Sequence, residues 1–346
     1  MKKLIIVIML LSLILIAACN GNVKDNNNNN DGVKIPVLAI KDYFPFTENS
    51  KYMYTGEGNE YASYTVYTDY ITETRVQTRT NNGGTEIVKV IEMKDGQLKE
   101  IFSRGETYFR ENFTDTKSDD GEILLKEPLI KGTSWTTGDN INRSITNVDV
   151  ELTTPLGTYK ALEVTSEGKD YKIVDYYAKD IGLIKTVNTG NGYEVSSTLS
   201  KIENDVPLVQ NINIYYPDMK GDILNSTNIP ISFNTNDEPK ELLEKTIKEM
   251  AEASQLMSTN TKINNLYLND DGMVYVDFSK EFITEMNAGS AYEAMILQSI
   301  TNTLGKYYGV ENVYITLDGK PYESGHIMMK EGEPFTVDLK NVKPTD

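Results

Sequence analysis

Three residue types are almost missing from this chain of 346 residues, which contains one cysteine, one histidine and one tryptophan. A single cysteine excludes an intramolecular disulfide, so packing must stabilise the folded parts. A single histidine, without an HExxH motif or a cysteine cluster, excludes the common zinc sites. No phosphate loop of the GxxxxGK or GxGxxG type is present either. The sequence therefore predicts neither a metal nor a cofactor.

Basic residues are also few, because 34 Lys and Arg stand against 51 Asp and Glu, a net charge of −17. This balance excludes nucleic acid as a partner, since phosphates require a basic face. It also argues against electrostatic adhesion to anionic lipid. The acidic surface is expected to be solvated and to keep the protein soluble. The length suits two domains.

One long apolar run is present, from Leu4 to Ala18, and it is preceded by two lysines. Its 15 residues are fewer than the ~20 that a membrane-spanning helix needs. Charge, apolar core and small residues in this order are typical of a secretory signal. The alternatives are a membrane span and an ordinary secreted protein in which Cys19 is incidental.

The end of this run, Ile16-Ala17-Ala18-Cys19, resembles the lipobox of bacterial lipoproteins. The resemblance implies a signal peptide at 1–18, lipidation of the Cys19 thiol and a place on the extracytoplasmic face of the cell membrane. Cleavage would leave 32 basic and 51 acidic residues, a net charge of −19. A diacylglyceryl group, common in such proteins, fits because one acyl chain anchors only marginally.

Residues 19–40 contain five consecutive asparagines, Asn26 to Asn30, between Asp25 and Asp31. No apolar residue recurs with a regular period, so the segment cannot bury a face. It is predicted to be a disordered tether, whose fifteen residues after Cys19 span roughly 20–25 Å on average.

Residues 41–203 alternate short runs rich in Tyr, Thr, Val and Ile with Gly-containing turns. This pattern predicts an all-β domain, an antiparallel curved sheet or open barrel of about eight to twelve strands. The stretch from Tyr176 to Lys185 resembles a signature of β-rich modules in Gram-positive lipoproteins. The predicted runs are Ala62–Thr80, Glu86–Glu92, Val148–Leu152, Tyr159–Thr165, Lys172–Ala178 and Glu194–Leu199.

A change of pattern at Ile202–Leu208 predicts a domain boundary, followed by a domain at 209–339 and a tail at 340–346. Asn236 to Pro239 is typical of a helix start, and Ser290 with Glu293 reads as a capping box for a second helix ending at Gly309. The order β-β-α-β-β-α-β predicts an α+β domain with both helices on one mixed sheet. Its strands are expected at Ile212–Tyr216, Ile229–Phe233, Asn264–Leu268, Met273–Phe278 and Val313–Leu317.

Several segments of this domain, in the same order, resemble the GerMN domain. They include Val274 to Phe282, Gly289-Ser290, Thr303-Leu304, Val313 to Gly319, and Gly325-His326. The domain is named for a lipoprotein of spore-forming bacteria needed in sporulation and germination. The resemblance implies a lipid-anchored protein that joins envelope or sporulation proteins, or the cell wall. It also implies a family-signature surface at Asp277, Asp318, Gly319, Gly325 and His326.

Two patterns contain residue types that could be catalytic. His326 lacks a neighbouring carboxylate and nucleophile in sequence, so a structural or surface role is expected. Asp277, Glu281 and Glu285 are four apart, and paired carboxylates can hydrolyse glycans. Asp277 however ends a strand, so it is expected to cap the turn that follows.

Two further patterns concern binding. Residues 116–127 partly match a calcium loop at Gly121, Ile123 and Glu127, but lack its first carboxylates, so a hairpin turn around Gly121 is preferred. Tyrosines 61, 64, 67 and 70 alternate with polar residues along one strand. They either pack in a core or line a groove for glycan or protein, and packing is the expected role.

Three functions follow from these observations. The first is a non-enzymatic, lipid-anchored envelope protein whose C-terminal domain docks onto proteins or the wall. The second is a cell-wall hydrolase using Asp277 and Glu281. The third is a binder of small apolar ligands in the β-rich domain.

Overall fold

The computed structural model describes residues 38–117, 120–138, 140–218, 223–250, 253 and 255–345. The predicted signal peptide, Cys19 and nearly all of the tether lie outside these residues. From residue 38 to the C-terminal end the chain forms one compact unit by its internal contacts. Among the described residues, none of the helices combines the length and the apolar character that a membrane span requires.

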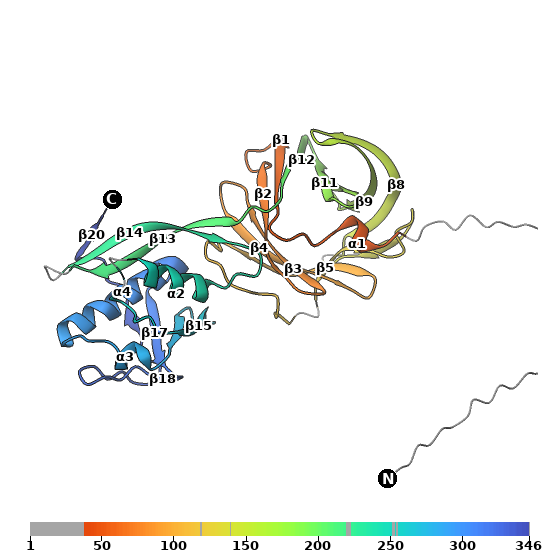
Figure 1. The fold of residues 1–346 in the computed structure, drawn as a ribbon. Helices are drawn as coiled ribbons and strands as arrows, with labels where there is room; N and C mark the ends of the chain where they lie inside the picture. Colours follow the sequence, from red (N-terminus) through yellow and green to blue (C-terminus); the bar gives the residue numbers. More distant parts are fainter. Residues whose placement is uncertain are drawn as a thin grey trace, which may run out of the picture. The chain divides into compact units, whose positions relative to one another are not determined.

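A twelve-stranded antiparallel sheet makes up the first part of this unit (Figure 1). Its strands are ordered β6-β5-β4-β3-β2-β1-β12-β11-β10-β9-β8-β7, and a short helix, α1 (Ile40–Tyr43), precedes them in the chain. The strands are β1 (Lys51–Glu57), β2 (Tyr64–Ile71), β3 (Arg75–Asn81), β4 (Glu86–Lys94), β5 (Gln97–Gly105), β6 (Glu122–Lys126), β7 (Ser134–Thr136), β8 (Asn142–Thr154), β9 (Gly157–Glu167), β10 (Tyr171–Ala178), β11 (Gly182–Gly190) and β12 (Tyr193–Glu203).

The sheet curves until its two outer strands, β6 and β7, come close together. Trp135 of β7 donates its indole N–H to the carbonyl of Ile123 on β6 at 2.9 Å. Arg143 of β8 donates to the same carbonyl at 2.8 Å and pairs with Glu122. Side-chain bonds thus nearly close the sheet where no backbone ladder does, and the predicted antiparallel curved sheet or open barrel is confirmed.

Most of the turns follow the predicted chemistry. Asp95 and Gly96 connect β4 to β5 with positive φ at both residues, the conformation that two-residue hairpins require. The exception is Gly121, which does not form a tight hairpin. A long connection from Glu106 to Gly121 separates β5 from β6, and it carries side chains that reach the second part of the unit.

Over its described residues, the second part contains two sheets and three helices. The strands are β13 (Leu208–Pro217), β14 (Leu224–Phe233), β15 (Ile263–Leu268), β16 (Val274–Phe278), β17 (Asn312–Leu317), β18 (Lys320–Pro321), β19 (Phe335–Thr336) and β20 (Val342–Pro344). The helices are α2 (Pro239–Glu249), α3 (Glu281–Thr284) and α4 (Ser290–Tyr308).

The α+β class is confirmed, and the structure adds one feature to the prediction. The mixed sheet has the order β15-β16-β17-β18, with β16 and β17 parallel and β19 paired to β17. Strands β13 and β14 do not join it, because they pair with each other and with β20 in a sheet of their own. Helix α4 contacts β13 of one sheet and β17 and β19 of the other. Helix α4 therefore packs against both sheets.

The helix ends show where sequence signals succeeded and failed. Pro239 is the first residue of α2, as its fixed φ favours. Gly309 ends α4 in the left-handed conformation, as predicted. The capping box at the start of α4 is wrong, because Gly289 is the N-cap and Ser290 already lies inside the helix. The Glu293 side chain is buried and bonds elsewhere.

Candidate functional site

Asp277 lies on β16 and is fixed by three donors. Its carboxylate accepts hydrogen bonds from the Thr316 hydroxyl at 2.6 Å, the Gly319 backbone N–H at 2.7 Å and the Asn264 amide at 2.9 Å. Asp318 and Gly319 have φ of 46° and 76°, the pair of positive values that a type I′ turn needs. Asp277 thus caps a turn, but this is the β17–β18 turn rather than the one following its own strand.

The other two acids of the predicted hydrolase set do not complete a catalytic pair. Glu281 is half-buried, and hydrogen bonds from Ser279 and the backbone lower its pKa. A general acid needs the opposite shift. Glu285 accepts a hydrogen bond from Asn260 at 2.9 Å, and its pKa is lowered by Ser258 and Asn260. Nothing in the described ranges joins these acids in a cleft.

His326 has a carboxylate partner that the sequence did not reveal. Its Nδ1 lies 2.6 Å from Oε2 of Glu293, which is on α4 and is 3% exposed. The other Glu293 oxygen accepts a hydrogen bond from the buried Tyr322 hydroxyl at 2.8 Å. Burial by itself would raise the pKa of Glu293, but hydrogen bonds from Ser324, His326 and Tyr322 outweigh it and lower the pKa. The cluster fastens residues 322–327 to α4.

The predicted signature residues therefore fall into two groups. Asp277 and Gly319 share a hydrogen bond, and Asp318 belongs to the same turn. His326 and Gly325 belong to the cluster around Glu293. Among the described residues no hydrogen bond or ion pair connects the two groups.

Three tyrosines form a row across the outer face of the mixed sheet. Tyr275 of β16 is in register with Tyr267 of β15 and Tyr314 of β17. The Tyr267 and Tyr275 rings stack at 5.5 Å between centroids, and the Tyr275 and Tyr314 rings meet edge-on at 5.1 Å. Tyr267 is 39% exposed. Alternation along β16 places Asp277 on this same outer face, while Val274, Val276 and Phe278 point inward.

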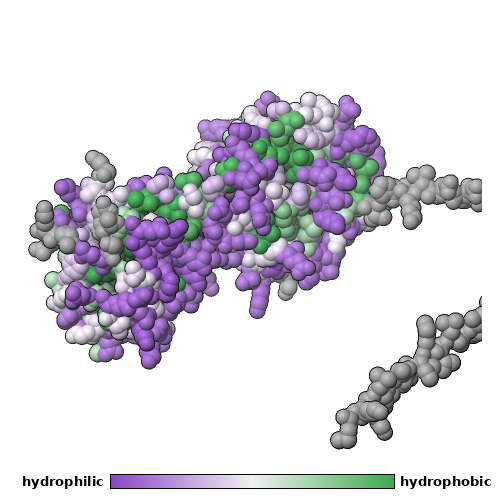
Figure 2. Space-filling view, viewed as in Figure 1, coloured by the Kyte–Doolittle hydropathy of each residue, from purple (hydrophilic) through white to green (hydrophobic). Residues whose placement is uncertain are grey.

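The twelve-stranded sheet contains a pocket of about 410 Å³. Its walls are mainly aromatic and aliphatic, and Figure 2 shows apolar surface over this sheet on the side in view. Tyr54 and Tyr64 stack in its wall at 4.4 Å between centroids. Asp175 lines it too, and burial raises the pKa of this carboxyl. Aromatic members of the wall are Phe44, Tyr52, Tyr54, Tyr64 and Tyr177.

The predicted tyrosine strand thus has divided roles. Tyr70 is buried and Tyr64 lines the pocket, so packing and a groove are both present in one strand. Tyr67 lies under the Lys51 ammonium at 5.4 Å. Tyr61 precedes β2 and is 52% exposed.

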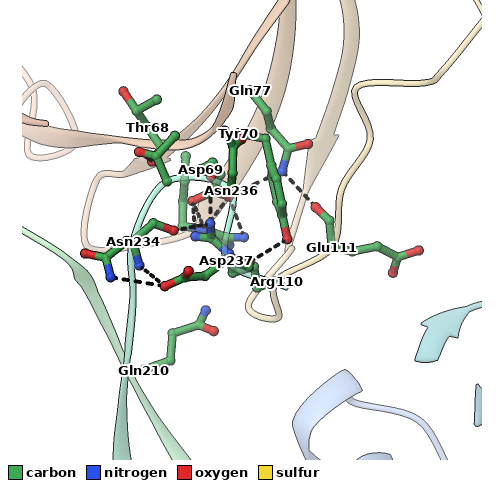
Figure 3. Close-up of polar contacts among 12 residues, drawn as sticks. Thr68, Asp69, Tyr70, Gln77, Arg110, Glu111, Gln210, Asn234, Asn236 and Asp237 are labelled. Carbon is green, nitrogen blue, oxygen red and sulfur yellow. Dashed lines mark hydrogen bonds and ion pairs between the residues drawn. The ribbon is translucent and has the colours of Figure 1, made fainter. Parts of the chain in front are cut away.

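A buried polar junction connects the long β5–β6 segment to the second part of the unit (Figure 3). Arg110 pairs with Asp69 at 3.3 Å, and both side chains are fully buried. It also donates to the carbonyls of Asn234 at 2.7 Å and Asp237 at 2.9 Å, which lie between β14 and α2. Its own backbone N–H donates to the Tyr307 hydroxyl of α4. The guanidinium lies 4.5 Å from the Tyr70 ring centroid.

In the described ranges, no group of three or more His, Cys, Asp or Glu side chains is placed so that it could hold a metal ion. The partial calcium-loop pattern includes residues 118 and 119, which lie outside these ranges. Within them, Glu127 accepts a hydrogen bond from the backbone N–H of Ile40, and residues 122–126 form β6.

Comparison with known families decides the nature of the second part. Residues 213–323 match the model of the Germane family, described as sporulation and spore germination. This chain carries a Germane domain. The match lies within the predicted span of 209–339, and the predicted resemblance to GerMN is confirmed. The match contains Asp277, Asp318 and Gly319, the whole tyrosine row, and Glu293 with Tyr322, but Gly325 and His326 lie beyond its end at residue 323.

Solved structures with similarity include GerM of Bacillus subtilis. Its tandem GerMN domains are 22% identical over 38% of this chain and 46% of that chain, with a TM-score of 0.27. The chain thus spans about half of that protein's length. The first GerMN domain alone is 22% identical over 38% of this chain and 96% of that one, with a TM-score of 0.23.

A further structure, assigned as an exported protein of Bacteroides fragilis with a YmcC-like fold, is 12% identical over 47% of this chain and 99% of that one, with a TM-score of 0.30. No curated protein sequence matches the chain.

Proposed function

We propose that this chain is a non-enzymatic, lipid-anchored envelope protein whose Germane domain docks onto a partner protein of the sporulation or germination machinery. The tyrosine row is the observation that carries the docking role: Tyr267 is exposed, Tyr275 is half-buried, and the row continues to the buried Tyr314. Tyrosine supplies a large contact area at a small entropic cost and is enriched in protein interfaces. The family description, sporulation and spore germination, supports the setting.

The chemistry of the carboxylates supports a non-enzymatic role. Asp277 is engaged by three donors and Glu293 by Tyr322 and His326. The pKa of Glu281 is lowered by hydrogen bonds from Ser279 and the backbone. A hydrolase would need one carboxyl kept protonated beside a second that is ionised, both facing a cleft. The residues weighed as catalytic act instead as internal hydrogen-bond acceptors or as solvated acids.

The anchor belongs to the same proposal. Lipidation at Cys19 would hold the protein on the extracytoplasmic face of the membrane, and the tether would let the Germane domain reach a partner. Labelling with radioactive palmitate tests it, with Cys19→Ala as the comparison. Label in the wild-type protein and none in the variant is the expected result; an unlabelled wild-type protein would refute the anchor.

A photo-crosslinking experiment tests the docking face in the full-length, membrane-associated protein. A photoreactive phenylalanine replaces Tyr267 in one version and Tyr193 in the other, since Tyr193 is similarly exposed at 46% but lies in the twelve-stranded sheet. We expect a discrete envelope protein to crosslink from position 267 only. The purified partner should then bind wild-type protein at least about tenfold more tightly than Tyr275→Ser, the loss typical of an interface hot spot. Equal crosslinking from both positions, or none from 267, would contradict the proposal.

The pocket in the twelve-stranded sheet favours a second candidate function, the binding of a small apolar ligand. Its volume of about 410 Å³ falls within the range of ligand sites. Native mass spectrometry of the purified full chain tests it through co-purified ligand.

A further inference from the structure

The charges around the pocket do not balance. Lys89, Glu100 and Asp175 are the charged residues among the described residues that line it. Lys89 and Glu100 neutralise each other through an ion pair of 2.7 Å. Arg143 lies close enough for its charge to lower the pKa of Asp175, but its guanidinium pairs with Glu122 at 2.7 Å, and the charge of Glu122 acts in the opposite direction. Among the described residues that line the pocket, no cation pairs with Asp175, so the pocket carries a net negative charge when this group is ionised.

Asp175 is also sparsely hydrogen-bonded for a carboxylate in such surroundings. It faces Thr186 across the β10–β11 ladder, and the Thr186 hydroxyl donates to its Oδ1 at 2.7 Å. In the part of the chain that the structure describes, this is the one hydrogen bond that the carboxylate receives. An ionised carboxylate can accept about four. Unused acceptor capacity therefore remains at the pocket wall, where leaving it unpaired is costly.

Aromatic rings surround this carboxylate. Tyr177 is two residues along the same strand, so its ring emerges on the same face of the sheet as Asp175. Tyr64 and Tyr177 both lie close enough to Asp175 for its charge to raise the pKa of their hydroxyls, after the larger effect of burial. Tyr64 in turn stacks on Tyr54. Carboxylate and aromatic faces together form the environment that binds organic ammonium groups.

We propose that the pocket binds an organic monocation with an apolar body, placing its ammonium group against Asp175 and its hydrocarbon part among the aromatic and aliphatic walls. This proposal rests on the second candidate function and specifies the ligand class. Charge complementarity selects the cation, because an anion would be repelled and a neutral ligand would leave the carboxylate desolvated and unpaired. The ligand must be small, since the pocket holds about 410 Å³.

Calorimetric titration of the full chain with three eight-carbon probes tests the ligand class. The probes are octyltrimethylammonium, octanol and octyl sulfate, which share one tail and differ in head charge. We expect the cation to bind at least about tenfold more tightly than octanol, as expected for a desolvated charge pair, and the sulfate not to bind. Equal affinity for all three, or a preference for the sulfate, would overturn the assignment.

Two variants and a pH series locate the effect. Asp175→Asn keeps the shape and should bring the cation down to the affinity of octanol, while leaving octanol binding unchanged. The matched control is Asp149→Asn, which removes a carboxylate from exposed β8 where it pairs with Lys160, and it should change neither affinity. Because burial raises the pKa of Asp175, cation affinity should increase as the pH rises through that pKa, and octanol affinity should stay constant. A cation affinity that is flat with pH would contradict the role of Asp175.

The outcomes distinguish the binding of a monocation from the more general binding of a small apolar ligand. Octanol binding without cation preference would leave apolar ligand binding intact and refute the monocation. No binding of any probe, in a protein whose unfolding curve is normal, would refute both.

Discussion

Arg110 and Asp69 form an ion pair with no exposed side-chain surface on either partner, 3.3 Å between Nη1 and Oδ1. Asp69 also pairs with Arg79 at 3.0 Å, so this one carboxylate holds two guanidinium groups. Arg79 lies on β3 and also pairs with Glu86 of β4, within the twelve-stranded sheet. Arg110 instead donates to the carbonyls of Asn234 and Asp237, which follow β14. Asp69 is therefore one connection between the twelve-stranded sheet and the Germane domain, beside the hydrogen bonds of Thr235 with Asn49 and of Asn236 with Ile71.

Replacing Arg110 with alanine should strongly destabilise the protein. The variant would leave the buried Asp69 carboxylate without one of its two cations. It would also remove one donor from each of three backbone carbonyls, those of Asp69, Asn234 and Asp237. Removing one partner of a buried pair costs about 3–5 kcal/mol, and we expect a loss of that size in the free energy of unfolding in urea. Lys160→Ala is the control, because its pair with Asp149 is exposed and should change stability by less than about 0.5 kcal/mol. Similar losses in both variants would show that the buried Arg110–Asp69 pair contributes no more to stability than the exposed Lys160–Asp149 pair.

Glu111 makes stability at this junction depend on pH. Burial raises its pKa from 4.5 to about 7, against opposing effects of the Leu268 N–H and Arg104, and with Glu238 adding to the rise. The folded state thus holds this proton between pH 4.5 and 7, where the unfolded chain has released it. The contribution of Glu111 to the free energy of unfolding is therefore fully present below pH 4.5. It is lost as the pH rises to 7, which lowers the free energy of unfolding by about 1–3 kcal/mol.

The variant Glu111→Gln isolates this group from the other acids. Its amide can still accept the hydrogen bond from the Leu268 N–H. Urea unfolding should therefore give nearly equal stabilities for variant and wild type at pH 4.5 and a more stable variant at pH 8. A constant difference between the two proteins across this range would show that Glu111 does not titrate as described.

The local signals of the sequence predicted more of the fold than of the site. Pro239 and Gly309 act through their own backbone angles, so the start of α2 and the end of α4 could be placed from sequence. Glu293 looked like half of a capping box, but its partners Tyr322 and His326 are about thirty residues away and compete successfully for its carboxylate. A motif cannot reveal such a competition, because it depends on which segments the fold brings together.

The sequence suggested a ligand-binding β-rich domain, but the residues of the pocket wall and of the junction could not be predicted, for one shared reason. Asp175 is a single acid within an otherwise β-forming run, which is as compatible with a solvated edge as with a pocket wall. Arg110 belongs to a connection whose length the sequence pattern hid, since Gly121 suggested a tight turn. Part of the tyrosine row could be predicted from the sequence, because Tyr275 and Tyr267 lie on the two strands of a predicted hairpin. Only the parallel pairing of β17 adds Tyr314.

Replacing Glu293 with alanine should loosen the segment that carries His326. The buried Tyr322 hydroxyl would lose its acceptor, and an unsatisfied buried hydroxyl costs about 1–3 kcal/mol. Hydrogen exchange should show faster amide exchange in residues 322–329, with little change in the twelve-stranded sheet. Glu281→Ala removes an acid that, among the described residues, makes no hydrogen bond with the Glu293 cluster, so it serves as the control and should leave exchange in residues 322–329 unaltered. Uniform acceleration throughout the protein would instead indicate global destabilisation.

Asp277 offers the sharpest distinction between a structural acceptor and a catalytic acid. Asp277→Ala would leave the Thr316 hydroxyl and the Gly319 N–H without their shared acceptor and should lower the free energy of unfolding by about 1–3 kcal/mol. Asp277→Asn retains an oxygen that can accept both bonds, so it should recover most of this stability. A catalytic carboxylate behaves differently, because asparagine cannot replace its charge or its proton. Urea unfolding of both variants, together with a zymogram on cell-wall material, compares the two roles. Recovery of stability in Asp277→Asn and a blank zymogram for every version are expected; a wild-type clearing zone that both variants abolish would establish the hydrolase.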